Sequence, residues 1–252
     1  MHVSLYIYQN HNKDTLARYN AAISIERALA LEFKNFSYYY LLPKEKADHP
    51  GDIGVKSVRR KKLEDGIASG EIKSFNMSNS TDLREQNTYA IYVNDKAHGG
   101  TANISLHFPC KYMCELQAIF ENIIGLSRAT YAFQIETDSA LKGISYVITS
   151  TLYRNERINF SSYLLNNDKI SKPRMMYPVN YFTETQLSYS HDGVTFRDFI
   201  NAYFGADALN ALGNDIFILK IDSEKLSEVN NDFGEAGFLI SWIETRKKRN
   251  SP

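Results

Sequence analysis

The chain has 252 residues, of which 43% are hydrophobic and 23% charged, a composition typical of a soluble globular protein with a large core. Lysine plus arginine balances aspartate plus glutamate, 29 against 29, so the overall charge gives no reason to expect binding to nucleic acid or to an anionic membrane. The N-terminal sequence lacks the features of a secretory signal, and no apolar run approaches the roughly 20 residues that span a bilayer, so we expect a cytoplasmic protein.

The N-terminal segment predicts a strand, a helix and a second strand. Residues 3–8 alternate in strand fashion and are rich in β-formers. Apolar residues then recur at helical spacing through residues 16–33, after Asp14 or Thr15 as an N-cap. Residues 36–43 predict the second strand, which ends at a proline. This order predicts a helix that covers one face of a sheet.

The following segment predicts mostly irregular structure. Residues 44–54 are polar and predict a loop, and residues 55–67 predict a short helix. Residues 59–62 form a run of four basic side chains that could contact phosphate or an acidic partner, although a solvated helix face is the simpler interpretation. Residues 69–86 contain few large apolar side chains and predict a flexible excursion.

A β-hairpin is predicted around the sequence TYAIYVNDKAHGGTANISLHFP. Its second strand alternates cleanly, which predicts a buried face and a solvated face. The residues expected on the buried face are Ala102, Ile104, Leu106 and Phe108, and those expected on the solvated face are Thr101, Asn103, Ser105 and His107. The tip of the hairpin is an exposed polar loop of the kind that binds partners, and its candidate partner-binding residues are Asn94, Asp95, Lys96 and His98.

The remaining elements complete an α+β pattern with a mixed, mostly antiparallel sheet or sheets packed against helices. The expected elements are a helix from Pro109 to Leu126, a strand at 130–136, a strand or buried helix at 143–153, a helix at 158–165, an extended segment at 171–182, a helix from Thr195 to Gly205, a strand at 215–222, a short helix after 223, a closing strand at 237–244 and a frayed basic tail. We expect a single domain over residues 1–252, with two similar halves, about 1–140 and 141–252, left open as an alternative.

The tripeptide His98-Gly99-Gly100 is close to the HGGG-type loop that helps to form the oxyanion hole of some esterases. That chemistry also requires a G-x-S-x-G elbow between a strand and a helix. The nearest sequence, Gly125-Leu126-Ser127-Arg128-Ala129, lacks the second glycine and follows a helix. The glycines are therefore better explained as turn residues, and we predict no catalytic residue.

Metal and cofactor motifs are also missing from the sequence. The six histidines never occur at the spacing of a local metal motif, and His107 with Cys110 and Cys114 is the only near-cluster. No phosphate-binding loop occurs. The carboxylates Asp192 and Asp198 are explained by helix capping. We therefore expect no metal, no cofactor and two free thiols.

Several stretches together resemble the immunity protein 52 family of bacterial polymorphic-toxin systems. These stretches are VSLYIY, IERALALEF, FSYYYLLPKEKADH and AIYVNDKAHGGTANISLHFP with the helix that follows it, and the resemblance covers residues 1–136. It implies an α+β fold and neutralisation of a toxin of the restriction-endonuclease type. It transfers no functional residue, and the balanced charge departs from the acidic character common among nuclease inhibitors.

The leading hypothesis is a cytoplasmic immunity protein, not an enzyme, that binds a cognate toxin of a type VI secretion system and occludes its functional surface; whether the toxin is a nuclease is left open. One alternative is a hydrolase-type enzyme with a non-local active site that uses His98 or His191. Another is a non-catalytic oligomeric binding module. No membrane or nucleic-acid partner is expected, and self-association is left open.

Overall fold

The computed structural model describes residues 1–9, 15–43, 45–49, 52–95, 102–126, 129–148, 150–166 and 170–243. The contacts within the chain divide it into two compact units, Met1–Ser145 and Tyr146–Pro252. Each unit combines antiparallel strands with helices, which confirms the predicted α+β class.

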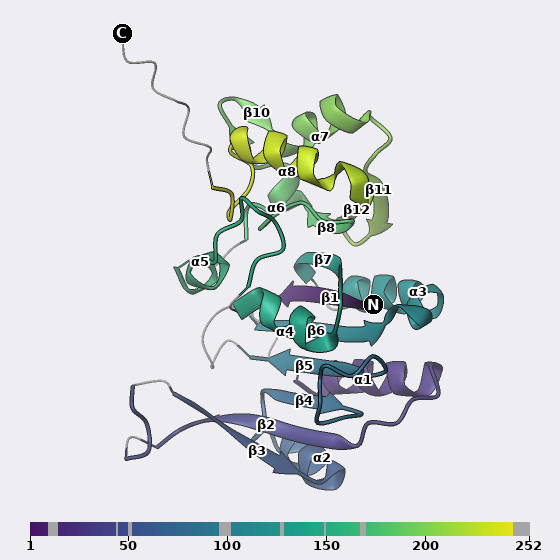
Figure 1. The fold of residues 1–252 in the computed structure, drawn as a ribbon, viewed down its shortest axis with the longest axis vertical. Coiled ribbons are helices and arrows are strands. Elements are labelled where there is room, and N and C mark those ends of the chain that lie inside the picture. Colours follow the sequence, from purple (N-terminus) through teal and green to yellow (C-terminus); the bar gives the residue numbers. More distant parts are fainter. Residues whose placement is uncertain are drawn as a thin grey trace. The chain divides into compact units, whose positions relative to one another are not determined.

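The first unit is built on antiparallel strands that follow one another in the order β3-β2-β4-β5-β6-β1-β7 (Figure 1). The strands are β1 (His2–Gln9), β2 (Asn35–Leu41), β3 (Ile53–Val58), β4 (Phe75–Ser78), β5 (Ala90–Asn94), β6 (Ala102–Pro109) and β7 (Ala129–Thr137). The helices are α1 (Thr15–Ala28), α2 (Arg60–Ala68), the 3-10 turn η2 (Cys110–Tyr112), α3 (Met113–Leu126) and α4 (Ala140–Ile148), the last of which runs across the division between the units.

One face of these strands is apolar and is covered by helices. Side chains of directly paired residues lie on the same face of a sheet, so the register assigns each residue to a face. Tyr19 of α1 packs edge-on against Phe75 with ring centroids 5.9 Å apart, and Arg60 of α2 lies over the Phe36 ring at 5.8 Å. Phe36 pairs with Met77, and Met77 is two positions from Phe75 on the same strand, so the Phe36 and Phe75 side chains lie on one face of the sheet. This face forms the core of the first unit.

The opposite face is polar and aromatic, and α4 covers one end of it. Gly143 lies so close to Ser4 and His107 that a side chain at this position would collide with both. The Tyr6 hydroxyl donates a hydrogen bond to the Gly143 carbonyl. The predicted solvated face of residues 101–108 is therefore wrong at this end, because His107 is fully buried and Ser105 nearly so.

Two further predictions for the first unit are corrected by the strand pairing. Residues 55–58 belong to β3 and pair with β2, so the predicted helix begins only at Arg60. The segment 69–86, expected to be a flexible excursion, contains β4, which lies between β2 and β5. Its alternating Phe75 and Met77 are fully buried, and this burial holds the short strand in the sheet.

The second unit contains the antiparallel strand order β11-β12-β8 and a separate two-stranded pair. Its strands are β8 (Val179–Thr183), β9 (Ser190–His191), β10 (Val194–Thr195), β11 (Asn210–Gly213) and β12 (Ile216–Lys220). Its helices are α5 (Phe160–Asn166), α6 (Glu184–Leu187), α7 (Phe196–Phe204), the 3-10 turn η3 (Ser223–Lys225) and α8 (Leu226–Glu235).

Helix α7 begins and ends as its sequence predicts. The Thr195 side chain accepts a hydrogen bond from the backbone N–H of Asp198 at 3.0 Å, and Asp198 also lies in the first turn of the helix. Gly205 ends the helix with a φ of 99°, which a residue with a side chain rarely adopts. The capping interpretation is confirmed for Asp198 but not for Asp192, which lies in the turn between β9 and β10.

The predicted closing strand at 237–244 is wrong. In its described part only Trp242 makes a β-bridge, to Glu156. The Trp242 ring lies directly on Gly234 of α8, where no side chain could fit. This apolar run is therefore buried by packing on a helix and forms no ladder. The ambiguous segment 143–153 is helical up to Ile148, and the basic tail lies outside the described residues.

Candidate partner-binding surface

A row of polar side chains crosses the polar face from Ser105, at the end that α4 covers, toward the edge of the sheet. We call this row the polar ladder; its members are Ser37, Asn76, Tyr92 and Ser105, which are direct cross-strand neighbours on β2, β4, β5 and β6. Ser37 Oγ donates to Asn76 Oδ1 at 2.8 Å, and Asn76 Nδ2 donates to the Tyr39 hydroxyl at 2.9 Å. The Tyr92 ring meets the buried His107 ring edge-on at 5.9 Å. The ladder thus runs from the interior to the sheet edge.

The two tyrosines of this region remain protonated at neutral pH. Burial raises the pKa of Tyr39, while its hydrogen bond from Asn76 acts in the opposite direction. Burial also raises the pKa of Tyr92, and the nearby Tyr39 adds to that rise. Both side chains therefore present neutral hydroxyl groups beside apolar ring surface, a combination common at protein interfaces.

An apolar patch adjoins the ladder at the sheet edge. We call it the hairpin patch and define it as Tyr39, Leu41, Ile53 and Val55, which share one face because Tyr39 pairs with Val55 and Leu41 with Ile53. The exposed fractions of Leu41, Ile53 and Val55 are 54%, 42% and 59%. Because neighbouring large apolar side chains are exposed on one face, this edge is a candidate interaction surface.

The sequence-predicted site residues fall partly on the same face. Asn94 ends β5 two positions after Tyr92, so it shares that residue's face, and its Nδ2 donates to Asn103 Oδ1 at 3.1 Å. The backbone N–H of Asp95 donates to Ser74 Oγ at 2.9 Å. Lys96 and His98 lie outside the described residues, as does the His98-Gly99-Gly100 tripeptide. Binding by any of these residues stays a prediction.

The hairpin patch could not be predicted from the sequence, because residues 53–54 were expected in a loop and residues 55–58 in a helix. The alternation in FSYYYLL places Tyr39 and Leu41 on one face of β2. Only the pairing of β2 with β3 brings Ile53 and Val55 next to them. The local signal for β3 was its β-branched Val55 and Val58, which the polar residues between them obscured.

A serine–histidine pair lies beneath the covered end of the polar face. Ser4 Oγ and His107 Nδ1 are joined by a hydrogen bond of 2.8 Å, and His107 Nε2 lies 3.1 Å from Ser105 Oγ. Ser4 and His107 are fully buried, and burial lowers the pKa of His107 to about 3. A substrate in solution has no access to this pair, so we interpret it as part of the packing between β1, β6 and α4.

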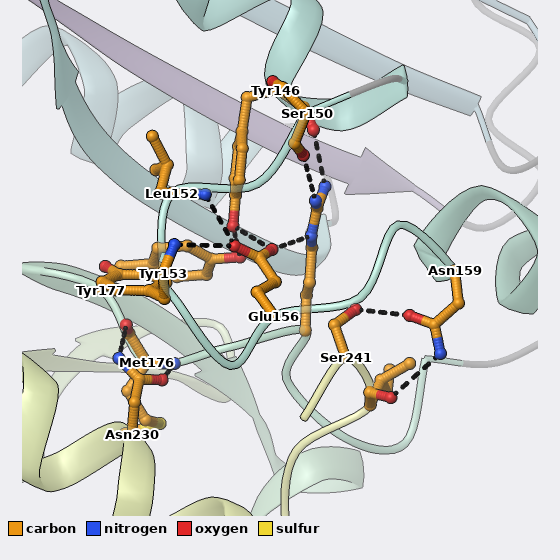
Figure 2. Close-up of polar contacts among 12 residues, drawn as sticks. Tyr146, Ser150, Leu152, Tyr153, Glu156, Asn159, Met176, Tyr177, Asn230 and Ser241 are labelled. Atoms are coloured by element: carbon orange, nitrogen blue, oxygen red, sulfur yellow. Dashed lines mark hydrogen bonds and ion pairs between the residues drawn. The ribbon is translucent and has the colours of Figure 1, made fainter. Parts of the chain in front are cut away.

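A second polar cluster lies in the second unit around Glu156 (Figure 2). The Glu156 carboxylate accepts hydrogen bonds from Tyr146 Oη at 2.6 Å, from Arg174 Nε at 2.8 Å and from the Leu152 N–H at 2.9 Å. The exposed fractions of the Arg174 and Glu156 side chains are only 1% and 0%.

The guanidinium group in this cluster is equally well satisfied. Arg174 donates to the carbonyls of Tyr146 and Ser150 at 3.0 and 3.1 Å, and it lies 4.0 Å from the centre of the Tyr146 ring. Burial raises the pKa of Tyr146 well above its usual value. The hydrogen-bonding groups are directed at one another, so the cluster ties irregular segments together and offers nothing to a ligand.

The other candidate chemical groups are dispersed. Within the described ranges, no three His, Cys, Asp or Glu side chains are placed to hold a metal ion. Cys110 and Cys114 are free thiols, and burial raises the pKa of Cys110. His191 Nε2 lies 3.9 Å from Asp192 Oδ2, and its ring contacts Phe238 edge-on. In the part of the chain that the structure describes, no helix has the length and apolar character that membrane crossing requires.

Comparisons with known proteins support the fold alone. No family model matches the chain, and a search of curated proteins gives no match. Among solved structures, the chain is similar to the Pseudomonas aeruginosa T6SS protein PA0821, with a TM-score of 0.53 and 11% sequence identity over 94% of this chain and 72% of that chain. The chain therefore has a fold that resembles that of a protein associated with type VI secretion.

Proposed function

We propose that this chain is an immunity protein that binds a cognate antibacterial toxin in the cytoplasm and neutralises it by covering the toxin's functional surface. The observation that carries the proposal is the hairpin patch. Leu41, Ile53 and Val55 expose large apolar side chains on one face of a sheet edge, next to the tyrosines and amides of the polar ladder. Apolar anchors with a polar rim are the composition of a protein–protein interface.

The rigidity of the surface favours tight binding. The patch and the ladder stand on strands that are paired through a continuous sheet, and Tyr39 is held by Asn76, which is held in turn by Ser37. A surface that is already ordered loses little conformational entropy when a partner binds. A stoichiometric inhibitor needs this property because it must hold the toxin without turning it over.

Two similarities support the type VI secretion context. The fold resembles a T6SS protein of Pseudomonas aeruginosa. The expected resemblance of residues 1–136 to the immunity protein 52 family agrees with that context, although no family model matches the chain. The balanced charge of 29 basic and 29 acidic residues gives no global mimicry of nucleic acid, so recognition would depend on local apolar and hydrogen-bonding contacts. The activity of the toxin, nuclease or other, is left to experiment.

The test is co-purification of the chain with the protein encoded by the adjacent gene. That protein carries an inactivating substitution, so that cells can produce it without being killed. We expect a stoichiometric complex that withstands size-exclusion chromatography, and we expect the chain to restore growth of cells that make the active toxin. Absence of a complex at micromolar concentrations would contradict the proposal, and so would rescue of growth by a chain that does not bind.

A further inference from the structure

Among the described residues, strand β3 is the outermost strand of the first unit and is paired on one side only, with β2. Its other edge carries backbone groups that are available to another strand. The backbone hydrogen bonds of β2 show which residues of β3 have N–H and C=O groups on the open edge. The Leu42 N–H donates to the Asp52 carbonyl at 2.8 Å, and the Tyr39 N–H donates in the opposite direction, to Ser74 beside β4, at 3.0 Å.

Inward and outward backbone groups alternate along an antiparallel pair. Because Leu42 and Asp52 form such a bonded pair, the backbone groups of the even-numbered residues of β3 bond to β2, and those of the odd-numbered residues point away from β2. Ile53, Val55 and Ser57 therefore direct their N–H and C=O groups to the open edge. The same residues place their side chains on the face of the hairpin patch.

This edge has few of the features that usually prevent strand addition. It contains no proline, it spans the six residues Ile53–Val58, and its single charged side chain, Lys56, lies on the face opposite the hairpin patch. Proteins commonly protect such edges with proline, inward charges or a covering element. An edge with large exposed apolar side chains fits the addition of a strand from another protein.

Unpaired positive charges lie at the end of β3 that leads into α2. Arg60 is held by Glu26 at 2.7 Å, and Lys61 by Asp65 at 2.9 Å. Lys56, Arg59 and Lys62 are exposed and have no ion pair among the described residues. Within the basic run 59–62, Arg60 is thus tied into the fold by an ion pair. The exposed charges of Lys56, Arg59 and Lys62 favour an acidic group on a molecule that binds beside them.

We infer that the partner contributes an extended strand that pairs with the free edge of β3, with apolar side chains on Ile53 and Val55 and an acidic side chain beside Arg59 and Lys62. This inference rests on the proposed function and specifies how the toxin would be held. Main-chain hydrogen bonds to positions 53, 55 and 57 would supply affinity, and the hairpin patch and the basic side chains would select the sequence.

The test compares Ser57→Pro with Ser57→Ala in the full chain, using the inactivated product of the adjacent gene as the probe. Proline removes the outward N–H of position 57 and leaves the bonds to β2, whereas alanine removes the side chain and keeps the N–H. We expect the Kd for the probe to rise at least 10-fold for Ser57→Pro and less than 3-fold for Ser57→Ala. A thermal unfolding curve establishes that the free variants are folded.

Hydrogen exchange of the wild-type chain gives an independent readout that needs no variant. We expect the amides of Ile53, Val55 and Ser57 to exchange at least 10-fold more slowly in the complex than in the free protein. A complex that forms with unprotected β3 amides and tolerates Ser57→Pro would overturn strand addition while leaving the proposed function intact.

Two other outcomes also contradict the inference. If the probe does not bind the wild-type chain, the proposed function fails and strand addition by a toxin fails with it. If the free chain is a dimer that Ser57→Pro dissociates, a second copy of the chain occupies the edge in place of the partner. Analytical ultracentrifugation of the free proteins distinguishes this case.

Discussion

The two polar clusters of this protein differ in their exposure to solvent. Around Glu156 in the second unit, a buried carboxylate, a guanidinium and two tyrosines satisfy one another, and the Arg174 and Glu156 side chains are almost inaccessible. In the first unit, the polar ladder is half-buried and continues into the exposed apolar side chains of the hairpin patch. The comparison shows that polar residue type alone does not distinguish the two clusters; they differ in burial and in the exposed apolar side chains that adjoin only the ladder.

The largest effect should follow from breaking the closed cluster. Glu156→Ala removes the carboxylate that Arg174, Tyr146 and two backbone N–H groups share, and it leaves a buried guanidinium unpaired. We expect a loss of about 3–5 kcal/mol in the free energy of unfolding, measured by urea denaturation. The matched control is Glu184→Ala, which removes the exposed ion pair with Arg197 and should cost less than about 1 kcal/mol. Equal losses for the two variants would contradict the interpretation of the Glu156 cluster as structural.

A substitution in the hairpin patch should have the opposite effect: it should weaken binding and leave stability almost unchanged. Val55→Asp places a charge in the hairpin patch, where Val55 is 59% exposed in the free protein. We expect the free energy of binding to the adjacent-gene product to weaken by about 2–3 kcal/mol, and the free energy of unfolding to change by less than about 0.5 kcal/mol. Isothermal titration calorimetry measures the first quantity and urea denaturation the second.

Val194→Asp is the control for that experiment, since Val194 is also an exposed valine, at 43%, but lies in the second unit. It should bind the partner like the wild-type chain. A similar loss of affinity for both variants would show that binding does not depend on the hairpin patch.

The buried end of the polar face predicts a pH dependence of stability. Burial lowers the pKa of His107 from 6.5 to about 3, so below pH 6.5 the unfolded chain binds a proton at this position and the folded chain does not. Stability contributed by neutral His107 is thus present above pH 6.5 and decreases as the pH falls, by about 2 kcal/mol between pH 6.5 and about pH 5. The pKa of the neighbouring His2 is lowered by burial as well, so it acts in the same direction.

Urea denaturation at several pH values measures this slope. In His107→Gln the slope should decrease by about 1 kcal/mol per pH unit below pH 6.5, whatever the variant costs in stability at neutral pH. His191→Gln serves as the control, because His191 is 42% exposed at its side chain. An unchanged slope in His107→Gln would mean that His107 is protonated in the folded protein.

The smallest effect should come from single hydroxyl groups on the open surface. Tyr39→Phe removes the acceptor of the Asn76 side chain and one donor that a partner could use, while the ring remains. We expect a loss of about 1 kcal/mol in binding and a similar or smaller loss in unfolding free energy. Tyr38→Phe is the control, because Tyr38 lies on the opposite face of the same strand. Equal effects on binding would show that the face of β2 does not matter.

The parts of the fold that local sequence patterns predict are those with strong periodicity or capping. Strand β1, the β5–β6 hairpin, and the helices α3 and α7 were all expected, because alternation, helical spacing, Thr195 and Gly205 report directly on the local backbone. Strands β3 and β4 were missed, since one is an edge strand with glycine and lysine and the other has four residues. Their conformation is fixed by their neighbours in the sheet.

The residues of the candidate surface were not predictable from the sequence, and the predicted site residue Asn94 lies only on the same face. Asn94 was expected from its position at the hairpin tip, and the structure places it on the face that carries Tyr92. The hairpin patch depends on the register between β2 and β3, and the burial of His107 depends on Gly143, 36 residues further along the chain. Neither relationship leaves a local pattern, because both arise from contacts between segments distant in sequence.

The central claim is that the hairpin patch neutralises a toxin, and growth of bacteria that produce the active adjacent-gene product tests it most directly. The wild-type chain and Val194→Asp should restore growth, whereas Val55→Asp, present at the same level of folded protein, should not. Rescue by Val55→Asp equal to that of the wild-type chain would contradict the claim.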